Sequence, residues 1–300
     1  MEIHDLDGSF KNEKECGIAL GNFDGIHIGH MALIDKVVAI SKYKNFCPSV
    51  LLFKEHTRPN TKLITNLKQK EKILNELGIE RVFLRSFDKN FMSLSAEDFV
   101  YSFLSDMLNI KLIVVGFDYR FGYKASGDVK KLMRLAEERD IEVIVENIVE
   151  IGGKAVSSSD IRQMIKGGNI EGANRLLYKN YALMGRVVDG NKRGRTMGFP
   201  TANIEITDNF VIPKFGVYLT EVNYKDKLYK SITNVGTNPT FKADDNVRVE
   251  AFIIDFSQDI YGEEIEISFI ERIRDEIKFD SKEALIEQMN KDVEIAMKKP

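Results

Sequence analysis

Residues 15–30 read ECGIALGNFDGIHIGH, and this stretch decides the fold of the first half of the chain. Its first part is apolar and has the length of a strand, whereas the residues from 30 onward follow a helical spacing. The turn between them, residues 21–30, holds three glycines and two of the chain's four histidines. A strand followed by a glycine-rich turn and a helix is typical of proteins built on a parallel sheet.

The same alternation continues to about residue 150. Apolar runs predict strands at 47–54, 80–87, 111–117 and 141–148, and amphipathic stretches predict helices at 30–43, 66–77, 96–109 and 129–139. Strict alternation predicts a parallel sheet with right-handed crossovers. Ligands of such sheets bind at the carboxyl ends of the strands.

The pattern changes in the second half. Short helices are expected at 160–166 and 170–177, and a period of two dominates from about residue 182, as in VRVEAFIIDF and EIEISFI. The last stretch, 281–299, predicts one amphipathic helix. The sequence therefore predicts an α/β domain, residues 1–182, followed by a smaller antiparallel β-barrel-like domain, residues 183–300.

The composition favours a globular chain that binds small ligands. Of 300 residues, 43% are hydrophobic and 30% charged, and the formal net charge is −3. This balance gives no general attraction for a polyanion, so we expect no nucleic-acid partner. Cys16 and Cys47 lack CxxC spacing and indicate neither a zinc site nor a disulfide framework. With no leader pattern and no run of about 18 apolar residues, we expect no membrane partner and a place in the cytoplasm.

The turn at 21–30 predicts a phosphate site. Backbone N–H groups and the helix dipole favour an anion at a strand-to-helix turn, and glycines permit close approach. His27 and His30, three residues apart, can donate hydrogen bonds to charge that develops on a phosphate. Two such histidines alone also fit a surface zinc pair or ordinary turn residues. The complete pattern matches the HxGH signature of the nucleotidyltransferase superfamily, and we expect its residues Gly21, Phe23, Asp24 and Gly25 to bind ATP phosphates.

Two further segments are expected to contribute to the same site. In VVGFDYRFGYKASGD, 114–128, Asp118 and Arg120 follow an apolar strand and are ligand candidates, although solvated loop charges are an equal alternative. In VSSSDIR, 156–162, the hydroxyls of Ser157 and Ser158 stand at a helix start with Arg162 in the first turn. One serine is explained by capping, and the whole group favours a second phosphate contact.

A second group of residues lies in GRVVDGNKRGRTMGFPTAN, 185–203. Its glycines and basic residues, among them Gly190, Gly194 and Arg195, are candidates for wrapping phosphates. Thr201 and Asn203 are two apart in an extended segment, so they share a face, and their oxygens suit Mg²⁺. A basic hairpin loop followed by an edge strand is the alternative.

Glu250, in VRVEAFIIDF, has two interpretations. Alternation puts it on the face opposite Val249 and Ala251, and the pattern alone favours a solvent-facing carboxylate. If it faces the metal at Thr201 and Asn203, it is placed to take a proton from an attacking hydroxyl as general base.

Together these motifs resemble one family over nearly the whole chain. They are, in order, LGNFDGIHIGH, FDKNFMSLSAEDFV, VVGFDYRFGYKASGD, VSSSDIRQMIKGGNIEGANRLL, GRVVDGNKRGRTMGFPTANI, PKFGVYLTEV, TNVGTNPTF, VEAFIIDFSQDIYGEEI and ERIRDEIKF. The series is similar to that of the prokaryotic bifunctional riboflavin kinases/FAD synthetases.

The resemblance implies two reactions. A Rossmann-like nucleotidyltransferase domain adenylylates FMN with ATP to give FAD and pyrophosphate. A β-barrel domain with a C-terminal helix phosphorylates riboflavin with ATP to give FMN. The implied roles are phosphate handling for His27, His30, Ser158 and Arg162, flavin binding for Asp118, Arg120 and Arg274, Mg²⁺ binding for Thr201 and Asn203, and base catalysis for Glu250.

Two departures from the family pattern keep alternatives open. The chain reads FKEHT at 53–57 where such proteins usually read FEPHP, and Asp160 replaces a basic residue in the serine loop. A riboflavin kinase with little or no FAD synthesis is therefore one alternative, and a flavin- or nucleotide-sensing protein without turnover is another. The oligomeric state stays open between a monomer and weak self-association.

Overall fold

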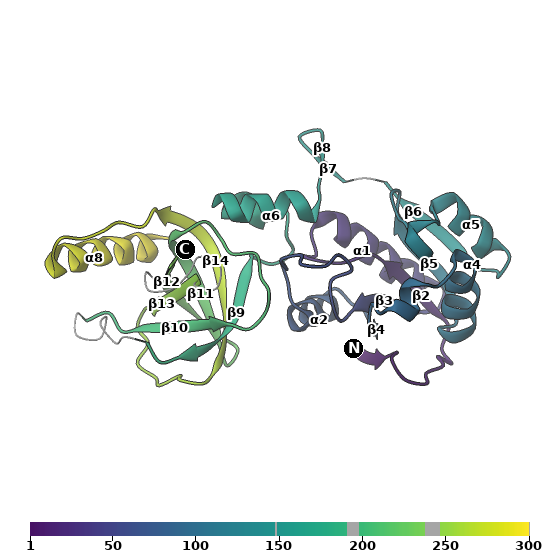
Figure 1. Cartoon of the computed structure of the whole chain (residues 1–300), viewed down its shortest axis with the longest axis horizontal. Helices are drawn as coiled ribbons and strands as arrows, with labels where there is room; N and C mark the ends of the chain where they lie inside the picture. Colours follow the sequence, from purple (N-terminus) through teal and green to yellow (C-terminus); the bar gives the residue numbers. More distant parts are fainter. Residues whose placement is uncertain (148, 191–197, 238–246, 300) are drawn as a thin grey trace. The chain divides into compact units, whose positions relative to one another are not determined.

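The computed structural model describes residues 1–147, 149–190, 198–237 and 247–299 (Figure 1). Contacts divide the chain into two compact units. Unit 1 consists of Met1–Thr61 and Asn66–Ser157, and unit 2 of Lys62–Thr65 and Ser158–Pro300. Among the helices of the described residues, none has the length and apolar character needed to span a bilayer.

Unit 1 is built on a six-stranded sheet with the order β1-β4-β3-β2-β5-β6. The strands are β1 (Glu2–Asp5), β2 (Cys16–Leu20), β3 (Cys47–Phe53), β4 (Arg81–Arg85), β5 (Ile110–Gly116) and β6 (Glu142–Glu146). All neighbouring strands are parallel, which confirms the predicted sheet. β1 is an additional edge strand. Its sequence EIHD has a single apolar residue, so it carries no recognisable strand pattern.

Helices alternate with these strands as predicted. They are α1 (Ile28–Tyr43), α2 (Leu67–Glu76), α3 (Lys89–Met92), α4 (Ala96–Asp98), the π-helix η1 (Phe99–Met107), the 3₁₀ turn η2 (Tyr123–Ala125) and α5 (Val129–Glu137). Side chains cap their starts: Asn66 forms a capping box with Gln69, and Asp128 accepts from the amide of Lys131 at 2.9 Å. A short hairpin, β7 (Glu150–Ile151) and β8 (Lys154–Ala155), follows β6.

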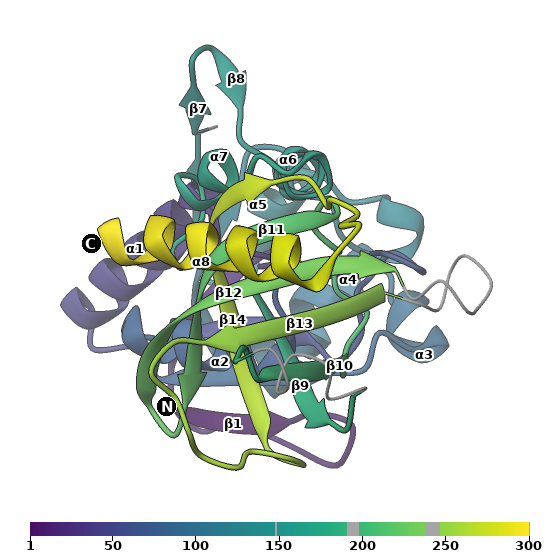
Figure 2. The same ribbon diagram turned by 90° about the vertical axis from the view of Figure 1, so that its left-hand side faces the viewer.

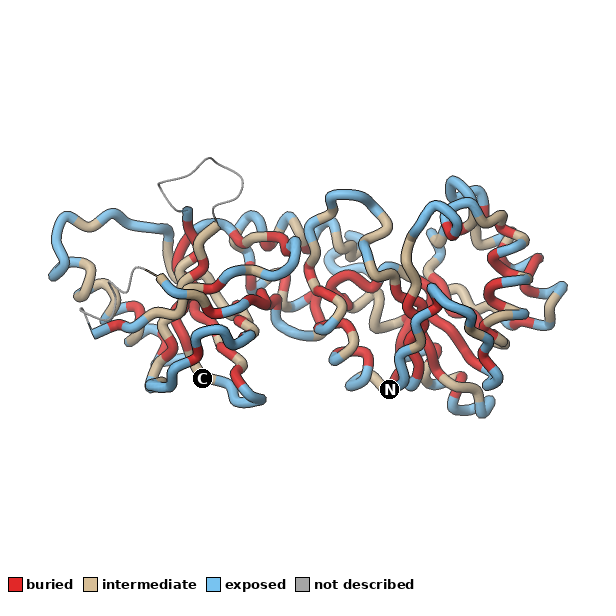
Figure 3. The backbone as a smooth tube through the Cα atoms, turned by 60° about the horizontal axis from the view of Figure 1, so that its bottom comes forward, coloured by how far each residue is buried: buried red, intermediate tan, exposed pale blue. Residues whose placement is uncertain are grey.

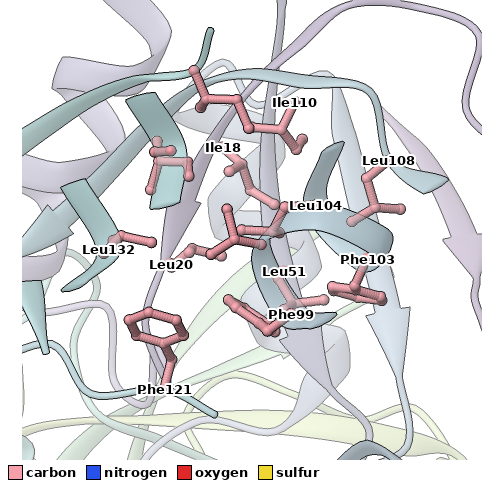
Figure 4. Packing of buried hydrophobic residues seen from close by; sticks show 14 of the residues in the cluster. Ile18, Leu20, Leu51, Phe99, Phe103, Leu104, Leu108, Ile110, Phe121 and Leu132 are labelled. Carbon is pink, nitrogen blue, oxygen red and sulfur yellow. The ribbon is translucent and has the colours of Figure 1, made fainter. Parts of the chain in front are cut away.

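The core of unit 1 lies between the central strands and the π-helix. Ile18 and Leu20 of β2 pack with Phe99, Phe103 and Leu104, as Figure 4 shows. Figure 3 shows the same concentration of buried residues along the central strands. β2 is buried along its whole length. Burial on both faces explains why this strand reads as a continuous apolar run.

Unit 2 contains a closed antiparallel barrel with the strand order β10-β13-β12-β11-β14-β9. The strands are β9 (Ala182–Val188), β10 (Thr201–Ile206), β11 (Gly216–Tyr224), β12 (Lys227–Thr237), β13 (Val247–Ile253) and β14 (Glu264–Arg274). The pairing of β9 with β10 closes the barrel. This confirms the predicted antiparallel barrel.

Within its described residues, unit 2 also contains three helices. α8 (Lys282–Lys298) lies across the barrel, as Figure 2 shows, and its Val293 and Ala296 pack on apolar residues of β11 and β12. α6 (Ser158–Gly167) and α7 (Ile170–Asn174) belong by their contacts to the same compact unit as the barrel. The compact units thus change at Ser157/Ser158, whereas the sequence places the domain boundary at 182/183, which stays a prediction.

Candidate active sites

The strand order of unit 1 places a topological switch point beside β2. From β2 the chain proceeds through β3 and β4 on one side, and β5 and β6 lie on the other side. The loops that leave β2 and β5 therefore diverge at the carboxyl edge of the sheet. Open α/β sheets bind ligands at such a switch point. The residues that follow β2 are those of the turn 21–27, and those that follow β5 begin the segment that holds Asp118 and Arg120.

The turn after β2 is buried and conformationally strained. Phe23 and Ile26 have φ angles of 47° and 39°, a region that residues other than glycine rarely adopt, and Gly25 has a φ of 89°. Phe23, Asp24 and Ile26 are fully buried. Strained, buried turns are characteristic of sites where the backbone has to be held in one conformation.

The two histidines are stacked at the start of α1. Their ring centroids are 3.8 Å apart with an interplanar angle of 19°. His27 is the N-cap residue, and its Nδ1 accepts a long hydrogen bond from the amide of His30, 3.4 Å away. A Cβ atom at Gly29 would lie 3.2 Å from two atoms of the His27 ring. A side chain at position 29 would therefore require the His27 ring to shift by a few tenths of an ångström.

His30 is held neutral by its surroundings. Burial lowers its pKa well below the usual range, and the nearby His27 and Lys70 lower it further. Its Nδ1 is buried and, among the described residues, has no hydrogen-bond partner. Lys70, a buried lysine of α2, donates to the carbonyl of Asn22 at 3.5 Å. Lys70 is thus a positive charge beside the turn that the sequence did not reveal, because its place depends on how α2 packs.

The residues of FKEHT, 53–57, which differ from the usual family sequence, make specific contacts in the structure. Thr57 donates to the side-chain oxygen of Asn22 at 3.0 Å and so contacts the turn itself. Lys54 pairs with Asp5 and Asp7 at 2.6 Å each, and these pairs lower the pKa of both carboxyls. Lys54 thereby links the end of β3 to the end of β1, on the other side of β4.

The segment after β5 is anchored by Phe121. Its buried ring packs against Phe99 with centroids 5.5 Å apart, and a Cβ at Gly127 would lie 2.6 Å from it. Asp118 and Arg120 are exposed, before this anchor. They lie at the predicted edge of the sheet, on a segment fixed to the core.

The serine segment extends from one unit into the other. Ser157 ends unit 1, whereas Ser158 and Arg162 belong to unit 2. The Nε of Arg162 donates to the carbonyl of Lys62 at 2.8 Å. Asp160 lies exposed in the first turn of α6, where a carboxylate is stabilised by the helix dipole. The roles of these residues at phosphates stay predictions.

The barrel brings together the second group of predicted residues. Asn203 of β10 is in register with Glu250 of β13, and Thr201 is in register with Phe252. Glu250 is also in register with Asn234 of β12. Residues in register share a face, so Asn203, Glu250 and Asn234 form one row across three strands.

This row lies on the outer face of the barrel, because Val249 and Ala251 are buried on the inner face. The side chain of Glu250 is nevertheless only 16% exposed, and it pairs with Arg248. The interpretation as an ordinary solvent-facing carboxylate therefore does not describe it well. Arg248 and Asn234 are neighbours that sequence reasoning missed, since strand register cannot be read from a local pattern.

Gly190 lies against the side chain of Asn203 and has no room for a side chain of its own. A Cβ at Gly190 would lie 1.9 Å from the side-chain nitrogen of Asn203 and 2.4 Å from its Cγ. The glycine leaves the space in which this carboxamide lies. Gly194 and Arg195, predicted for the same loop, lie outside the described residues.

Two family models match the chain in order. Residues 9–160 match the FAD synthetase family, and residues 177–299 match the riboflavin kinase family. A bifunctional riboflavin kinase/FMN adenylyltransferase from Listeria monocytogenes is 38% identical over 282 residues, which cover 92% of this chain and 89% of that protein. The chain belongs to the bifunctional riboflavin kinase/FMN adenylyltransferase family.

Further relatives agree in length. A protein of the same description from Buchnera aphidicola is 35% identical over 94% of this chain and 92% of its own. A crystal structure described as a macrolide-efflux protein from Streptococcus pneumoniae has a TM-score of 0.90 and 34% identity over 99% of both chains. The predicted enzyme, a riboflavin kinase and FMN adenylyltransferase, is confirmed by the family models and the curated relatives.

Families of ATP-dependent kinases and adenylyltransferases generally use a divalent metal ion. The described residues contain no cluster of three or more His, Cys, Asp or Glu side chains that could hold a metal. Thr201 and Asn203 do not count toward such a cluster, because they offer hydroxyl and carboxamide oxygens. Hard oxygen donors of this kind suit a cation that keeps most of its waters.

Arg274, the residue predicted near the flavin, has a structural contact within unit 2. Its guanidinium pairs with Asp292 of α8, with an Nη2 to Oδ2 distance of 2.7 Å and an Nε to Oδ1 distance of 3.1 Å. The Asp292 side chain is 2% exposed, and Gln288 donates to it at 2.9 Å. Arg274 therefore fastens the C-terminal helix to β14, and its role toward the flavin stays a prediction.

Proposed function

We propose that Glu250 is the general base of the riboflavin kinase reaction. It would take the proton of the ribityl hydroxyl as this oxygen attacks the γ-phosphorus of ATP. The register of Glu250 with Asn203 is the observation that supports this most strongly, because it joins the carboxylate to the predicted metal ligands. Arg248, paired with Glu250, would keep the carboxylate oriented.

Mg²⁺ fits the residues on this face. Thr201 and Asn203 supply neutral oxygens two residues apart on β10, and Gly190 leaves room for the carboxamide of Asn203. Bound there, Mg²⁺ would neutralise charge on the phosphates of ATP. Gly190, Gly194 and Arg195 would contact those phosphates.

In unit 1 we assign FMN adenylylation to the turn beside β2. The phosphate of FMN attacks the α-phosphorus of ATP, and pyrophosphate leaves. His27 and His30 would donate hydrogen bonds to the oxygens on which charge develops. The backbone of Gly21, Phe23, Asp24 and Gly25 would hold the phosphates, with Ser157, Ser158 and Arg162 as further contacts. The buried Nδ1 of His30 supports this assignment, since a buried polar atom calls for a partner.

The remaining assignments follow from the same two reactions. Asp118 and Arg120 would bind FMN in unit 1, and Arg274 would lie near riboflavin in unit 2. We expect domains at 1–182 and 183–300, and a monomeric or weakly self-associating protein without nucleic acid. Because both reactions consume ATP, we expect it to act in the cytoplasm.

The test compares Glu250→Gln with Glu221→Gln, a carboxylate of β11. The proteins are incubated with Mg²⁺, ATP and either riboflavin or FMN, and the flavins are separated. Glu250→Gln should lower FMN formation by roughly 10²- to 10⁴-fold, the range of a general base, and should leave FAD formation from FMN unchanged. Glu221→Gln should leave both rates unchanged. FMN formation at the wild-type rate by Glu250→Gln would refute the assignment.

A further inference from the structure

The two cysteines of the chain meet at the amino edge of the parallel sheet. Cys16 is the first residue of β2 and Cys47 the first of β3, and the two are in register. Side chains in register on neighbouring strands point to the same face. No local pattern predicts this pair, because 30 other residues and a whole crossover helix separate the cysteines.

The pair lies in polar surroundings that favour a thiolate. The side-chain nitrogen of Asn12 donates to the Sγ of Cys16 at 3.2 Å and to the carbonyl of Leu108 at 2.8 Å. Asn12 in turn accepts from the buried guanidinium of Arg81. Cys16 is fully buried, whereas Cys47 is partly exposed. The Sγ of Cys47 also lies 4.0 Å from a carboxylate oxygen of Glu80.

These contacts shift the pKa values of the two thiols in opposite directions. A hydrogen bond from Cys47, together with Asn12 and Arg81, lowers the pKa of Cys16 to about 7, although burial opposes the shift. The pKa of Cys47 is raised, because it holds the proton that it shares with Cys16 and because burial and Glu80 disfavour a second charge. The pair therefore gives up its first proton near neutral pH, whereas an isolated thiol does so near pH 8.5.

We propose that Cys16 and Cys47 are a redox-reactive dithiol that hydroperoxides oxidise to a reversible disulfide within unit 1. Cys47 passes the shared proton to Cys16, and its partly exposed sulfur, now a thiolate, attacks one oxygen of hydrogen peroxide, so that the O–O bond breaks. The departing oxygen takes this proton back from Cys16 and leaves as water. Cys47 is then a sulfenic acid.

The thiolate of Cys16 completes the reaction. It attacks the sulfur of Cys47, the S–S bond forms and the S–O bond breaks, and the departing hydroxide takes a proton from solvent to become water. Two thiols lose two electrons and two protons in total, and one peroxide becomes two waters. A reducing thiol reverses the process by exchange.

The register of the two cysteines on neighbouring strands is compatible with a disulfide. Neighbouring strands lie about 4.7–4.9 Å apart, within the range of about 4.4–6.8 Å that disulfides span between Cα atoms but below its most frequent values. Such a bond forms without separating the strands, and its short span makes it easily reduced. A labile bond is typical of a regulated disulfide, not of a structural one.

The test uses intact-mass measurement of the full chain before and after hydrogen peroxide, and again after dithiothreitol. The wild-type monomer should lose the mass of two hydrogen atoms and regain it with the reductant. In Cys16→Ser, Cys47 has no partner and should accumulate as a sulfenic acid that dimedone traps. In Cys47→Ser, the buried Cys16 should react far more slowly than the wild-type pair.

A second measurement does not depend on oxidation. The alkylation rate of wild type should reach half its maximum near pH 7. That of Cys16→Ser should reach half its maximum at a higher pH, about 8.5. The proposal is overturned if peroxide yields only disulfides between chains or only sulfinic and sulfonic acids. It is also overturned if wild type and Cys16→Ser alkylate with the same pH dependence.

Discussion

At the scale of the residue, the geometry of the HxGH turn depends on its smallest residue, Gly29. Gly29 separates the two histidines, and any side chain there would press on the ring of His27. The strain at Phe23 and Ile26 shows that the backbone before the histidines is also fixed. The position of the imidazoles thus depends on neighbours that carry no chemistry themselves.

The substitution Gly29→Ala tests this dependence. Alanine suits the first turn of α1, so folding should be unaffected, but its Cβ would lie 3.2 Å from the His27 ring and displace it. We expect FAD formation from FMN to fall roughly tenfold or more, because small misplacements of positioned groups are costly. FMN formation from riboflavin should be unchanged. The control is Gly8→Ala, whose Cβ would have no neighbour within 4 Å, and an equal loss in both variants would argue against the explanation.

The lowered pKa of His30 predicts a pH dependence of stability. The folded chain keeps His30 neutral well below its usual pKa of 6.5, whereas the unfolded chain takes up the proton there. The unfolded state then binds more protons, so the free energy of unfolding falls as the pH drops below 6.5, by at most about 1.4 kcal/mol per pH unit. Urea unfolding at pH 6.5 and 5.5 measures the loss. Between these two pH values, His30→Gln should lose less stability than wild type, whereas the control His4→Gln should lose as much as wild type. Equal losses in all three proteins would contradict the prediction.

Residue-scale inference from the sequence was possible where the predicted site is contiguous. All parts of the turn 21–30 are neighbours along the chain, so their spacing alone led to the prediction of a phosphate site, and this role stays a prediction. Glu250 and Asn203 are distant in sequence, and only the pairing of β10 with β13 shows that they are adjacent. Lys70 and the dithiol depend on packing and register in the same way, and no local pattern reports either.

At the scale of the element, the C-terminal helix is held to the barrel by two kinds of contact. Val293 and Ala296 pack on apolar residues of the strands, and the buried carboxylate of Asp292 pairs with Arg274. The amphipathic pattern of 281–299 predicted the helix but not the pair. From the sequence alone, a single aspartate in a helix is predicted to face solvent. Its pairing with a residue of a distant strand cannot be read from the helix pattern.

Removing Asp292 should therefore weaken the attachment of α8 to the barrel. Asp292→Ala leaves the guanidinium of Arg274 partly buried without its counter-charge, which costs about 3–5 kcal/mol for buried pairs. The control Glu287→Ala removes an exposed carboxylate that pairs with Lys291 on the same helix and should cost less than about 1 kcal/mol. Urea unfolding followed by circular dichroism compares the two. Equal losses would show that the pair contributes no more than a surface contact.

At the scale of the whole molecule, the chain carries two folds with separate cores. The parallel sheet of unit 1 and the barrel of unit 2 each bury their own apolar residues. The sequence predicted both architectures because each has its own periodicity, strand and helix in alternation in the first and a period of two in the second. Helices α6 and α7 lie between these periodic regions, and there the predicted boundary and the compact units differ.

Separate cores imply that each activity can be removed without the other. They also imply that two variants, each lacking one activity, can together make FAD from riboflavin. His30→Ala should convert riboflavin to FMN and stop there, and Glu250→Gln should make FAD only when FMN is supplied. A mixture of the two variants given riboflavin, ATP and Mg²⁺ should accumulate FAD, because FMN released by one chain is the substrate of the other. The matched control is the double variant at the same total concentration, which should make neither flavin. If the mixture formed FMN but no FAD while Glu250→Gln still adenylylated added FMN, FMN would not be leaving the chain that makes it.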